Sequence, residues 1–170
     1  MITQYRSLLC FIVALFSINL LCAAEVDKST VIVRASTWET KDHGGVGDFP
    51  PKNTLDGKVS VESSWRGEGK GAWIQWDLGR TYRLRSVEIA FLFGDKRYYT
   101  FDLLVTASPD GSRDWRPVRL KARSSGTTLD FESFACEGAP VRHVKLVGYG
   151  NSSEKFPEWN NLTEVRFVVE

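Results

Sequence analysis

The chain carries eight short runs in which apolar and polar side chains alternate. In one of them, Val87, Ile89 and Phe91 alternate with Glu88 and Ala90. A period of two places every second side chain on the same face, so each run is typical of a strand with one buried face. The runs cover residues 31–36, 74–78, 87–93, 101–105, 115–120, 127–134, 141–147 and 165–169.

Turn-forming residues separate many of these runs. Asp-Leu-Gly at 77–79, Pro-Asp-Gly at 109–111 and Ser-Ser-Gly at 124–126 are typical of tight turns. No segment shows a sustained helical period, so the pattern predicts an all-β fold, an eight-stranded antiparallel jelly-roll β-sandwich in a single domain. Long loops gather at the ends of such a sandwich and are where a binding site is expected. The long loops are residues 37–52, 53–71, 94–99 and 148–161.

The first residues have the pattern of a targeting segment. Residues 8–21 are apolar, and small residues precede Glu25. This is typical of a secretory signal peptide over residues 1–24. A membrane anchor is the alternative, but the apolar run is shorter than the ~20 residues of a spanning helix. We therefore expect cleavage after Ala24, a β-sandwich domain over 25–170, and a secreted or periplasmic protein.

The predicted mature domain is electrically neutral. Removing residues 1–24 removes Arg6 and no acid, which leaves 21 basic and 21 acidic side chains. This balance argues against nucleic acid as a partner. Cys10 and Cys22 leave with the signal peptide, so Cys136 stays alone and no internal disulfide forms. We expect Cys136 to be buried as a small apolar residue.

One loop concentrates oxygen donors. Residues 53–66 read NTLDGKVSVESSWR, in which Asp56 offers a carboxylate, Gly57 permits a tight turn and Ser63 offers a hydroxyl. Calcium binds about six to eight such oxygens. Glu164 can add a second carboxylate if the first and last strands are neighbours. The alternative is a surface turn with a solvated Glu164.

Basic and aromatic side chains cluster on the same long loops. Sugars bind to aromatic rings and to planar polar groups, and the carboxylate of a uronate favours Arg or Lys. Bases clustered in a neutral domain therefore favour an acidic sugar as ligand. The candidates are Trp38, His43, Arg66, Lys70, Lys96, Arg97, Tyr98, Lys155, Phe156 and Trp159.

A series of short motifs occurs in a fixed order along almost the whole mature chain. This order resembles the discoidin, or coagulation-factor C-type, domains of the galactose-binding-like superfamily, and within that group the family 32 carbohydrate-binding modules. Three longer segments, GDKRYYTF, SSGTTLDFESF and GYGNSSEKFPEWNNLTEV, also resemble modules attached to alginate lyases. The short motifs are S-x-W, W-I-x-W-D-L-G, S-V-E-I-A-F, T-A-S-P-D-G-S-x-x-W, V-R-H-V-K-L-V-G and L-T-E-V.

The resemblance implies a structural calcium ion and a sugar-binding surface. Calcium would be held by carbonyls of Asn53, Lys58, Ser63 and Thr163 and by side chains of Asp56, Ser63 and Glu164. This chain departs from the related domains in two ways: Ser63 stands where threonine is commoner, and two extra residues lie between Asp56 and Trp65. The sugar would be held by His43, Arg97, Trp159 and Asn160, with Arg66 added from its place after S-x-W and Tyr98 from the GDKRYY turn.

These expectations lead to one main hypothesis and two alternatives. The main hypothesis is a secreted, lectin-like and non-catalytic module that binds an acidic, uronate-containing polysaccharide or its oligosaccharides. The first alternative is a cell-surface adhesion domain that binds protein or phospholipid, with 49–51 and 156–157 as hydrophobic spikes. The second is a polysaccharide lyase, but the short motifs of jelly-roll alginate lyases are missing from the sequence. We therefore expect no enzyme activity and no membrane partner.

Overall fold

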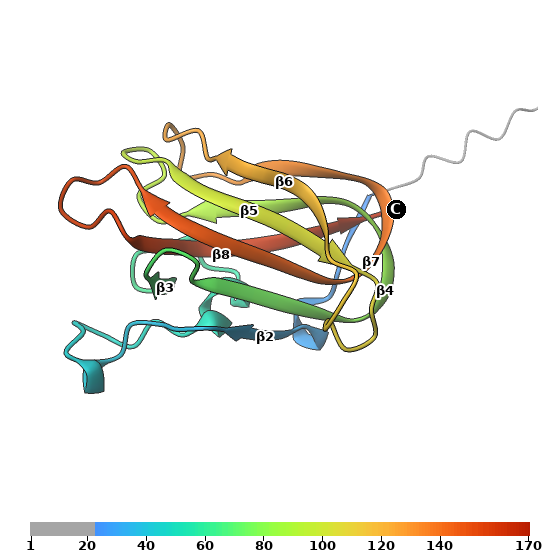
Figure 1. The fold of residues 1–170 in the computed structure, drawn as a ribbon, viewed down its shortest axis with the longest axis horizontal. Helices are drawn as coiled ribbons and strands as arrows, with labels where there is room; N and C mark the ends of the chain where they lie inside the picture. Colours follow the sequence, from blue (N-terminus) through green and yellow to red (C-terminus); the bar gives the residue numbers. More distant parts are fainter. Residues whose placement is uncertain (1–22) are drawn as a thin grey trace, which may run out of the picture.

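The computed structural model describes residues 23–170, and nearly all of the predicted signal peptide lies outside this range. The described chain is an antiparallel β-sandwich (Figure 1), as the alternation predicted. Its strands are β1 (Ala24–Glu25), β2 (Ile32–Ala35), β3 (Trp65–Glu68), β4 (Trp73–Phe91), β5 (Tyr99–Thr106), β6 (Arg116–Arg123), β7 (Glu132–Asn151) and β8 (Trp159–Val169). Three short 3-10 helices are η1 (Lys28–Thr30), η2 (Lys41–His43) and η3 (Pro51–Leu55).

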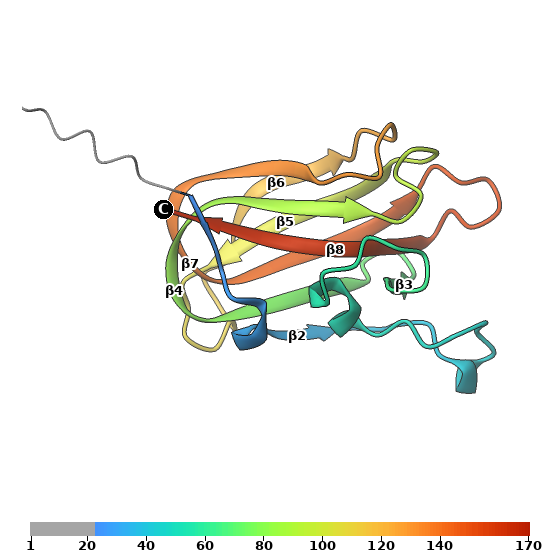
Figure 2. The ribbon, with the colours of Figure 1, turned by 180° about the vertical axis from the view of Figure 1, so that it is seen from behind.

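Two long strands take part in both layers of the sandwich. The first half of β4 pairs with β2 and with the second half of β7, which also pairs with β5. The second half of β4 pairs with β8 and with the first half of β7. The register of β4 shifts between Asp77 and Tyr82, where both strands bend around one end of the molecule (Figures 1 and 2). The predicted turn at 77–79 is therefore a bend within one strand.

The core fills the space between the two layers. Trp76 on β4 meets Phe167 on β8 edge to face, with ring centroids 5.8 Å apart. Phe101 on β5 contacts Phe91 at 5.5 Å and Phe134 at 5.3 Å. Such aromatic contacts add to the free energy of burying large apolar surfaces. The alternating apolar positions of β4, β5 and β8 are therefore the inward faces of these strands, whereas Leu120 of β6 is exposed.

The structure also shows where the remaining cysteine and the predicted core tryptophans lie. Cys136 is buried and has no disulfide partner, and its burial raises the pKa of its thiol to about 11. Trp65 and Trp76 are fully buried, whereas Trp73 lies half-exposed under the ammonium group of Lys145. Within residues 23–170, no helix is long and apolar enough to cross a membrane.

The long loops lie at the end of the sandwich opposite the bend. The segment between β2 and β3 and the hairpin between β7 and β8 both extend at this end (Figures 1 and 2). The C-terminus lies at the other end, beside β1, because Ala24 pairs with Val169. A site built from the long loops is therefore remote from both ends of the described chain.

Candidate functional site

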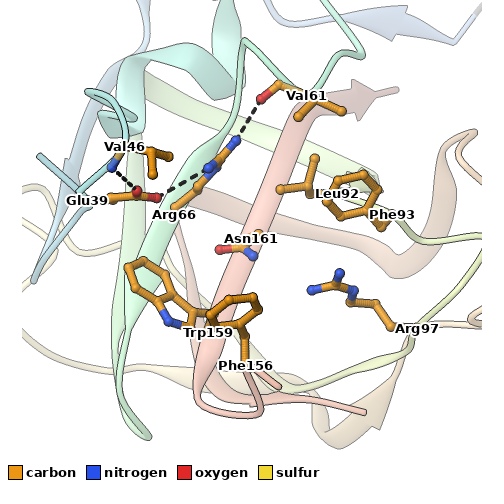
Figure 3. Close-up of a pocket in the computed structure, with 10 residues that line it drawn as sticks. All are labelled: Glu39, Val46, Val61, Arg66, Leu92, Phe93, Arg97, Phe156, Trp159 and Asn161. Atoms are coloured by element: carbon orange, nitrogen blue, oxygen red, sulfur yellow. Dashed lines mark hydrogen bonds and ion pairs between the residues drawn. The ribbon is translucent and has the colours of Figure 1, made fainter. Parts of the chain in front are cut away.

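A cavity of about 500 Å³ opens among the long loops. Figure 3 shows Asn161 of β8 near its centre, with Arg66 on one side and Arg97 on the other. Apolar side chains form much of the remaining wall, so the two guanidinium groups face a space bounded by aromatic and aliphatic surface. The lining residues are Glu39, Val46, Val61, Arg66, Leu92, Phe93, Arg97, Phe156, Trp159 and Asn161.

Arg66 is held rigidly at the cavity wall. Its Nη1 atom lies 3.3 Å from Oε2 of Glu39, and its Nη2 atom donates a 3.0 Å hydrogen bond to the carbonyl of Val61. Its Nε atom donates to the hydroxyl of Ser64 at 3.2 Å, and the guanidinium lies 3.4 Å from the centre of the Phe49 ring. Planar guanidinium groups suit such combined stacking and hydrogen bonding. Arg66 is thus oriented before any ligand arrives, but Glu39 balances much of its charge.

Arg97 carries the less compensated charge of the two. It lies on the turn after β4, with its guanidinium 4.9 Å from the centre of the Phe93 ring. Among residues 23–170, none of the ion pairs involves Arg97. A guanidinium that lacks an acidic partner and lines a cavity is suited to bind a ligand carboxylate in a bidentate manner.

Asn161 forms the floor of the cavity and has an unsatisfied polar atom. Its side chain is 5% exposed, and its Oδ1 atom has no hydrogen-bond partner. Leaving such an oxygen unpaired costs about 1–3 kcal/mol. The residue lines the cavity, although this oxygen itself is buried. Sequence reasoning missed Asn161, although the neighbouring Asn160 was predicted.

Asn160 is a structural residue and does not line the cavity. Its Oδ1 atom accepts a 2.7 Å hydrogen bond from the amide of Gly150, and its Nδ2 atom donates to the carbonyls of Gly67, Gly69 and Glu158. Successive residues of a strand point to opposite faces, so Asn160 and Asn161 cannot both face the ligand. The register of β8 therefore turns Asn161, and not the predicted Asn160, toward the cavity, and sugar binding by Asn160 stays a prediction.

This difference predicts unequal effects on stability for two neighbouring substitutions. Asn160→Ala is expected to lower the free energy of unfolding by about 2 kcal/mol, because it leaves buried backbone groups without partners. Asn161→Ala is expected to change it by less than about 1 kcal/mol, because it removes an oxygen that is already unpaired. Urea denaturation of both variants would measure this. Equal losses would contradict the assignment.

Two other predicted sugar-binding residues lie outside this cavity. The ring of Tyr98 lies beneath the guanidinium of Arg123, at 4.7 Å, and does not line the cavity. The next residue, Tyr99, is buried and donates a 2.7 Å hydrogen bond to the carbonyl of Leu92. His43 lines a second hollow of about 350 Å³ on the other side of Trp159. Four predicted residues are thus brought together by the cavity: Arg66, Arg97, Phe156 and Trp159.

The predicted cation loop brings its two acidic side chains to the same region. Oδ2 of Asp56 accepts a hydrogen bond from the hydroxyl of Ser63, and Oδ1 accepts one from the amide of Lys58 at 2.9 Å. Oε2 of Glu164 accepts a 2.9 Å hydrogen bond from the amide of Gly57. Of the other predicted ligands, the side chain of Asn53 donates to Ser64 and that of Thr163 donates to Ala90.

A lysine supplies positive charge at this loop. The Nζ atom of Lys28 lies 2.6 Å from Oε1 of Glu164, whose side chain is only 1% exposed. Burial raises the pKa of Glu164, although the hydrogen bonds from Lys28 and Gly57 act in the opposite direction. Lys28 is on η1, far from the loop in sequence, and the sequence analysis did not connect it with Glu164.

A calcium ion at this loop would have to compete with protein donors for the same carboxylates. Calcium needs about six to eight oxygens that converge on it. Both oxygens of Asp56 and both oxygens of Glu164 already accept hydrogen bonds from protein donors. The ammonium group of Lys28 would also repel a divalent cation bound to the same carboxylate. Across residues 23–170, no three acidic, histidine or cysteine side chains form a metal-like group. Calcium binding here stays a prediction.

Comparison with known proteins places the chain among domains of known fold. The F5/8 type C domain model matches residues 33–162. A family 32 carbohydrate-binding module of AlyQ, solved with 4,5-unsaturated mannuronic acid, is 29% identical, with a TM-score of 0.67 over 80% of this chain and 92% of that one. No curated protein sequence matches the chain.

Two more distant structures share the fold alone. A pectin-binding carbohydrate-binding module is 20% identical, with a TM-score of 0.67 over 80% of this chain and 88% of that one. The family 32 module of Clostridium perfringens NanJ, solved with galactose, is 8% identical, with a TM-score of 0.66 over 86% and 98%. The family model covers most of this chain, and several of the solved structures that resemble it are family 32 carbohydrate-binding modules. The chain therefore belongs to the F5/8 type C, or discoidin, domain family.

Proposed function

We propose that this domain is a secreted, non-catalytic carbohydrate-binding module whose cavity over Asn161 holds an acidic sugar. The observation that carries the proposal is the pair of guanidinium groups, from Arg66 and Arg97, in a cavity walled by aromatic side chains. A neutral sugar has no need of two cations, whereas a uronate carries a carboxylate on the ring itself.

Each wall of the cavity has a role in this proposal. Trp159 and Phe156 offer ring surface for the C–H face of a sugar, and the amide of Asn161 offers a partner for a hydroxyl. Arg97 would bind the carboxylate with its two parallel N–H groups, which is the strong geometry for such a pair. Arg66, whose charge is partly balanced by Glu39, would offer a fixed planar group and a weaker positive potential from the opposite side. These five side chains together favour a sugar ring that is apolar on one face and carries a negative charge at one edge.

The similarity to the module of AlyQ supports a uronate as the ligand class. That module was solved with 4,5-unsaturated mannuronic acid, and it is 29% identical to this chain. A second structure of AlyQ contains such a module together with an alginate lyase domain. Alginate and its oligosaccharides are therefore the first acidic polysaccharides to test.

Tyr99, which lies near Arg66 and Arg97, is not suited to act as a catalytic base. A lyase needs a base within hydrogen-bond reach of the substrate, with a pKa near the working pH. The hydroxyl of Tyr99 is committed to the carbonyl of Leu92, and burial raises its pKa to about 12, although the charge of Arg97 opposes the shift. These features support a binding module over a lyase.

The adhesion alternative has less support. Phe49 was one of the two predicted hydrophobic spikes, but its ring packs against the guanidinium of Arg66, and Pro51 is buried. Phe156 is 47% exposed, but it lines the cavity beside Trp159. Liposome sedimentation remains the direct test of this alternative.

Calorimetry with matched ligands would test the proposed function. The ligands are oligosaccharides of mannuronate, guluronate and galacturonate, and the same oligosaccharides after their carboxylates have been reduced to alcohols. At least one acidic series is expected to bind, and reduction of the carboxylates is expected to weaken binding at least about 10-fold, or about 1.4 kcal/mol. Equal binding of acidic and reduced ligands, or no binding by folded protein, would overturn the proposal.

A further inference from the structure

We infer that the second hollow, across Trp159 from the first cavity, is a subsite for a neutral sugar joined to the uronate. This inference rests on the proposed function and specifies the chemical class of its ligand. The hollow has a volume of about 350 Å³ and is formed mainly by the segment between β2 and β3. It shares Glu39, Val46 and Trp159 with the first cavity, so the two spaces adjoin.

The second hollow has the aromatic surface that a sugar ring requires. Trp38 is 41% exposed and lies on one of its walls, and Trp159 lies on another. Trp38, Val46 and Phe156 are all exposed and line the two adjoining spaces, and a group of exposed apolar side chains is typical of a binding surface. A disaccharide could thus contact Trp159 while one ring lies in each space.

The charge of the second hollow is opposite to that of the first. Glu39 and Glu68 line it, together with His43 and the hydroxyl-bearing Thr37 and Thr40, and no lysine or arginine does so among the described residues. Glu39 is fixed there, because its Oε1 atom accepts a 2.9 Å hydrogen bond from the amide of Val46 while Oε2 pairs with Arg66.

The loop packs tightly around the side chain of Glu39. A Cβ atom at Gly45 would lie 2.6 Å from Cγ of Glu39 and 2.7 Å from the carbonyl oxygen of Thr40, so only glycine allows the loop to fold here. The hydroxyl of Thr40 lies 3.1 Å from Nδ1 of His43, which also fixes the imidazole. These contacts give the hollow a defined set of acceptors for sugar hydroxyls.

The opposite charges of the two spaces determine which disaccharide fits. A second uronate would place its carboxylate near Glu39 and Glu68, where like charges repel each other. A neutral hexose would instead donate its hydroxyl groups to these carboxylates. The pair of subsites therefore selects one uronate next to one neutral sugar, as in polysaccharides in which acidic and neutral sugars are adjacent. A homopolymeric uronate would use the first cavity alone.

The test compares three kinds of probe by calorimetry. These are the methyl glycosides of single uronic acids, diuronates, and disaccharides of one uronic acid and one neutral hexose in both linkage orders. One of the mixed disaccharides is expected to bind at least about 10-fold more tightly than the methyl glycoside of its uronic acid, and the diuronates are expected to gain less than about threefold.

Two substitutions would test whether the tighter binding of the mixed disaccharide comes from the second hollow. Trp38→Ala is expected to abolish the preference for the mixed disaccharide, and Glu68→Gln is expected to strengthen binding of the diuronate. Trp115→Ala and Glu154→Gln are matched controls, because neither residue lines either space. Thermal denaturation would show that each variant is folded.

The outcomes separate this inference from the proposed function. If the methyl glycoside binds but no mixed disaccharide binds more tightly, or if Trp38→Ala leaves the preference intact, the second subsite is wrong and the acidic-sugar site stands. If no acidic probe binds to folded protein, the proposed function fails as well.

Discussion

Replacing Arg97 with alanine is expected to weaken the binding of an oligouronate about 100-fold, or about 2.7 kcal/mol. Arg97 lines the cavity without an acidic partner among the described residues, so a ligand carboxylate would be its main counter-charge. Arg97→Lys keeps the charge but loses the bidentate geometry, so it is expected to recover only part of the affinity. The free energy of unfolding should change little, because the side chain makes no ion pair.

Calorimetry of three variants would check this prediction. Arg123→Ala is the matched control, because the guanidinium of Arg123 lies over Tyr98 and outside the cavity. The effect of Arg97→Ala should also disappear when the ligand carboxylate has been reduced to an alcohol. A loss that persists with the reduced ligand, or an equal loss in Arg123→Ala, would show that Arg97 does not bind the carboxylate.

Replacing Lys28 with methionine is expected to lower the free energy of unfolding by about 4 kcal/mol. The variant would leave the carboxylate of Glu164, which is 1% exposed, with a single hydrogen bond from the amide of Gly57. Breaking one side of a buried ion pair costs more than the pair itself contributes, because the remaining charge stays desolvated. Urea denaturation would measure the loss, with Lys52→Met as a control at an exposed lysine that makes no ion pair.

The same variant also tests the predicted calcium ion. If Lys28 supplies the positive charge at this loop, a chelator should leave the melting temperature of the native chain unchanged. Calcium should then restore stability only in Lys28→Met, where the competing ammonium group is gone. A fall of several degrees when chelator is added to the native chain would support calcium at Asp56 and Glu164, and would rule out this role for Lys28.

Alternation in the sequence predicted eight strands, as the structure has, but not where the separate strands begin and end. The predicted runs 74–78 and 87–93 fall at the two ends of β4, which stops at Phe91, because the turn-like Asp77-Leu78-Gly79 bends the strand without ending it. β1 and β3 are too short for a period of two to be visible. A local pattern identifies which side chains are buried, whereas pairing with distant strands decides where a strand ends.

The candidate site shows the same division between local and distant information. Arg66, Arg97 and Trp159 were predicted because bases and aromatic residues on long loops have few structural roles. Asn160 was preferred to Asn161 because nothing local distinguishes two adjacent asparagines. Which of them faces the cavity depends on the pairing of β8 with β3.

The pairing of β1 with β8 has a consequence for how this domain can be displayed. Ala24 lies opposite Val169, so the described chain enters and leaves the sandwich at one place, at the end remote from the cavity. Any tether attached at this place, whether to a surface or to another protein, would hold the domain by its base and leave the mouth of the cavity facing outward. The domain could then sample a polysaccharide from any direction except that of its own support.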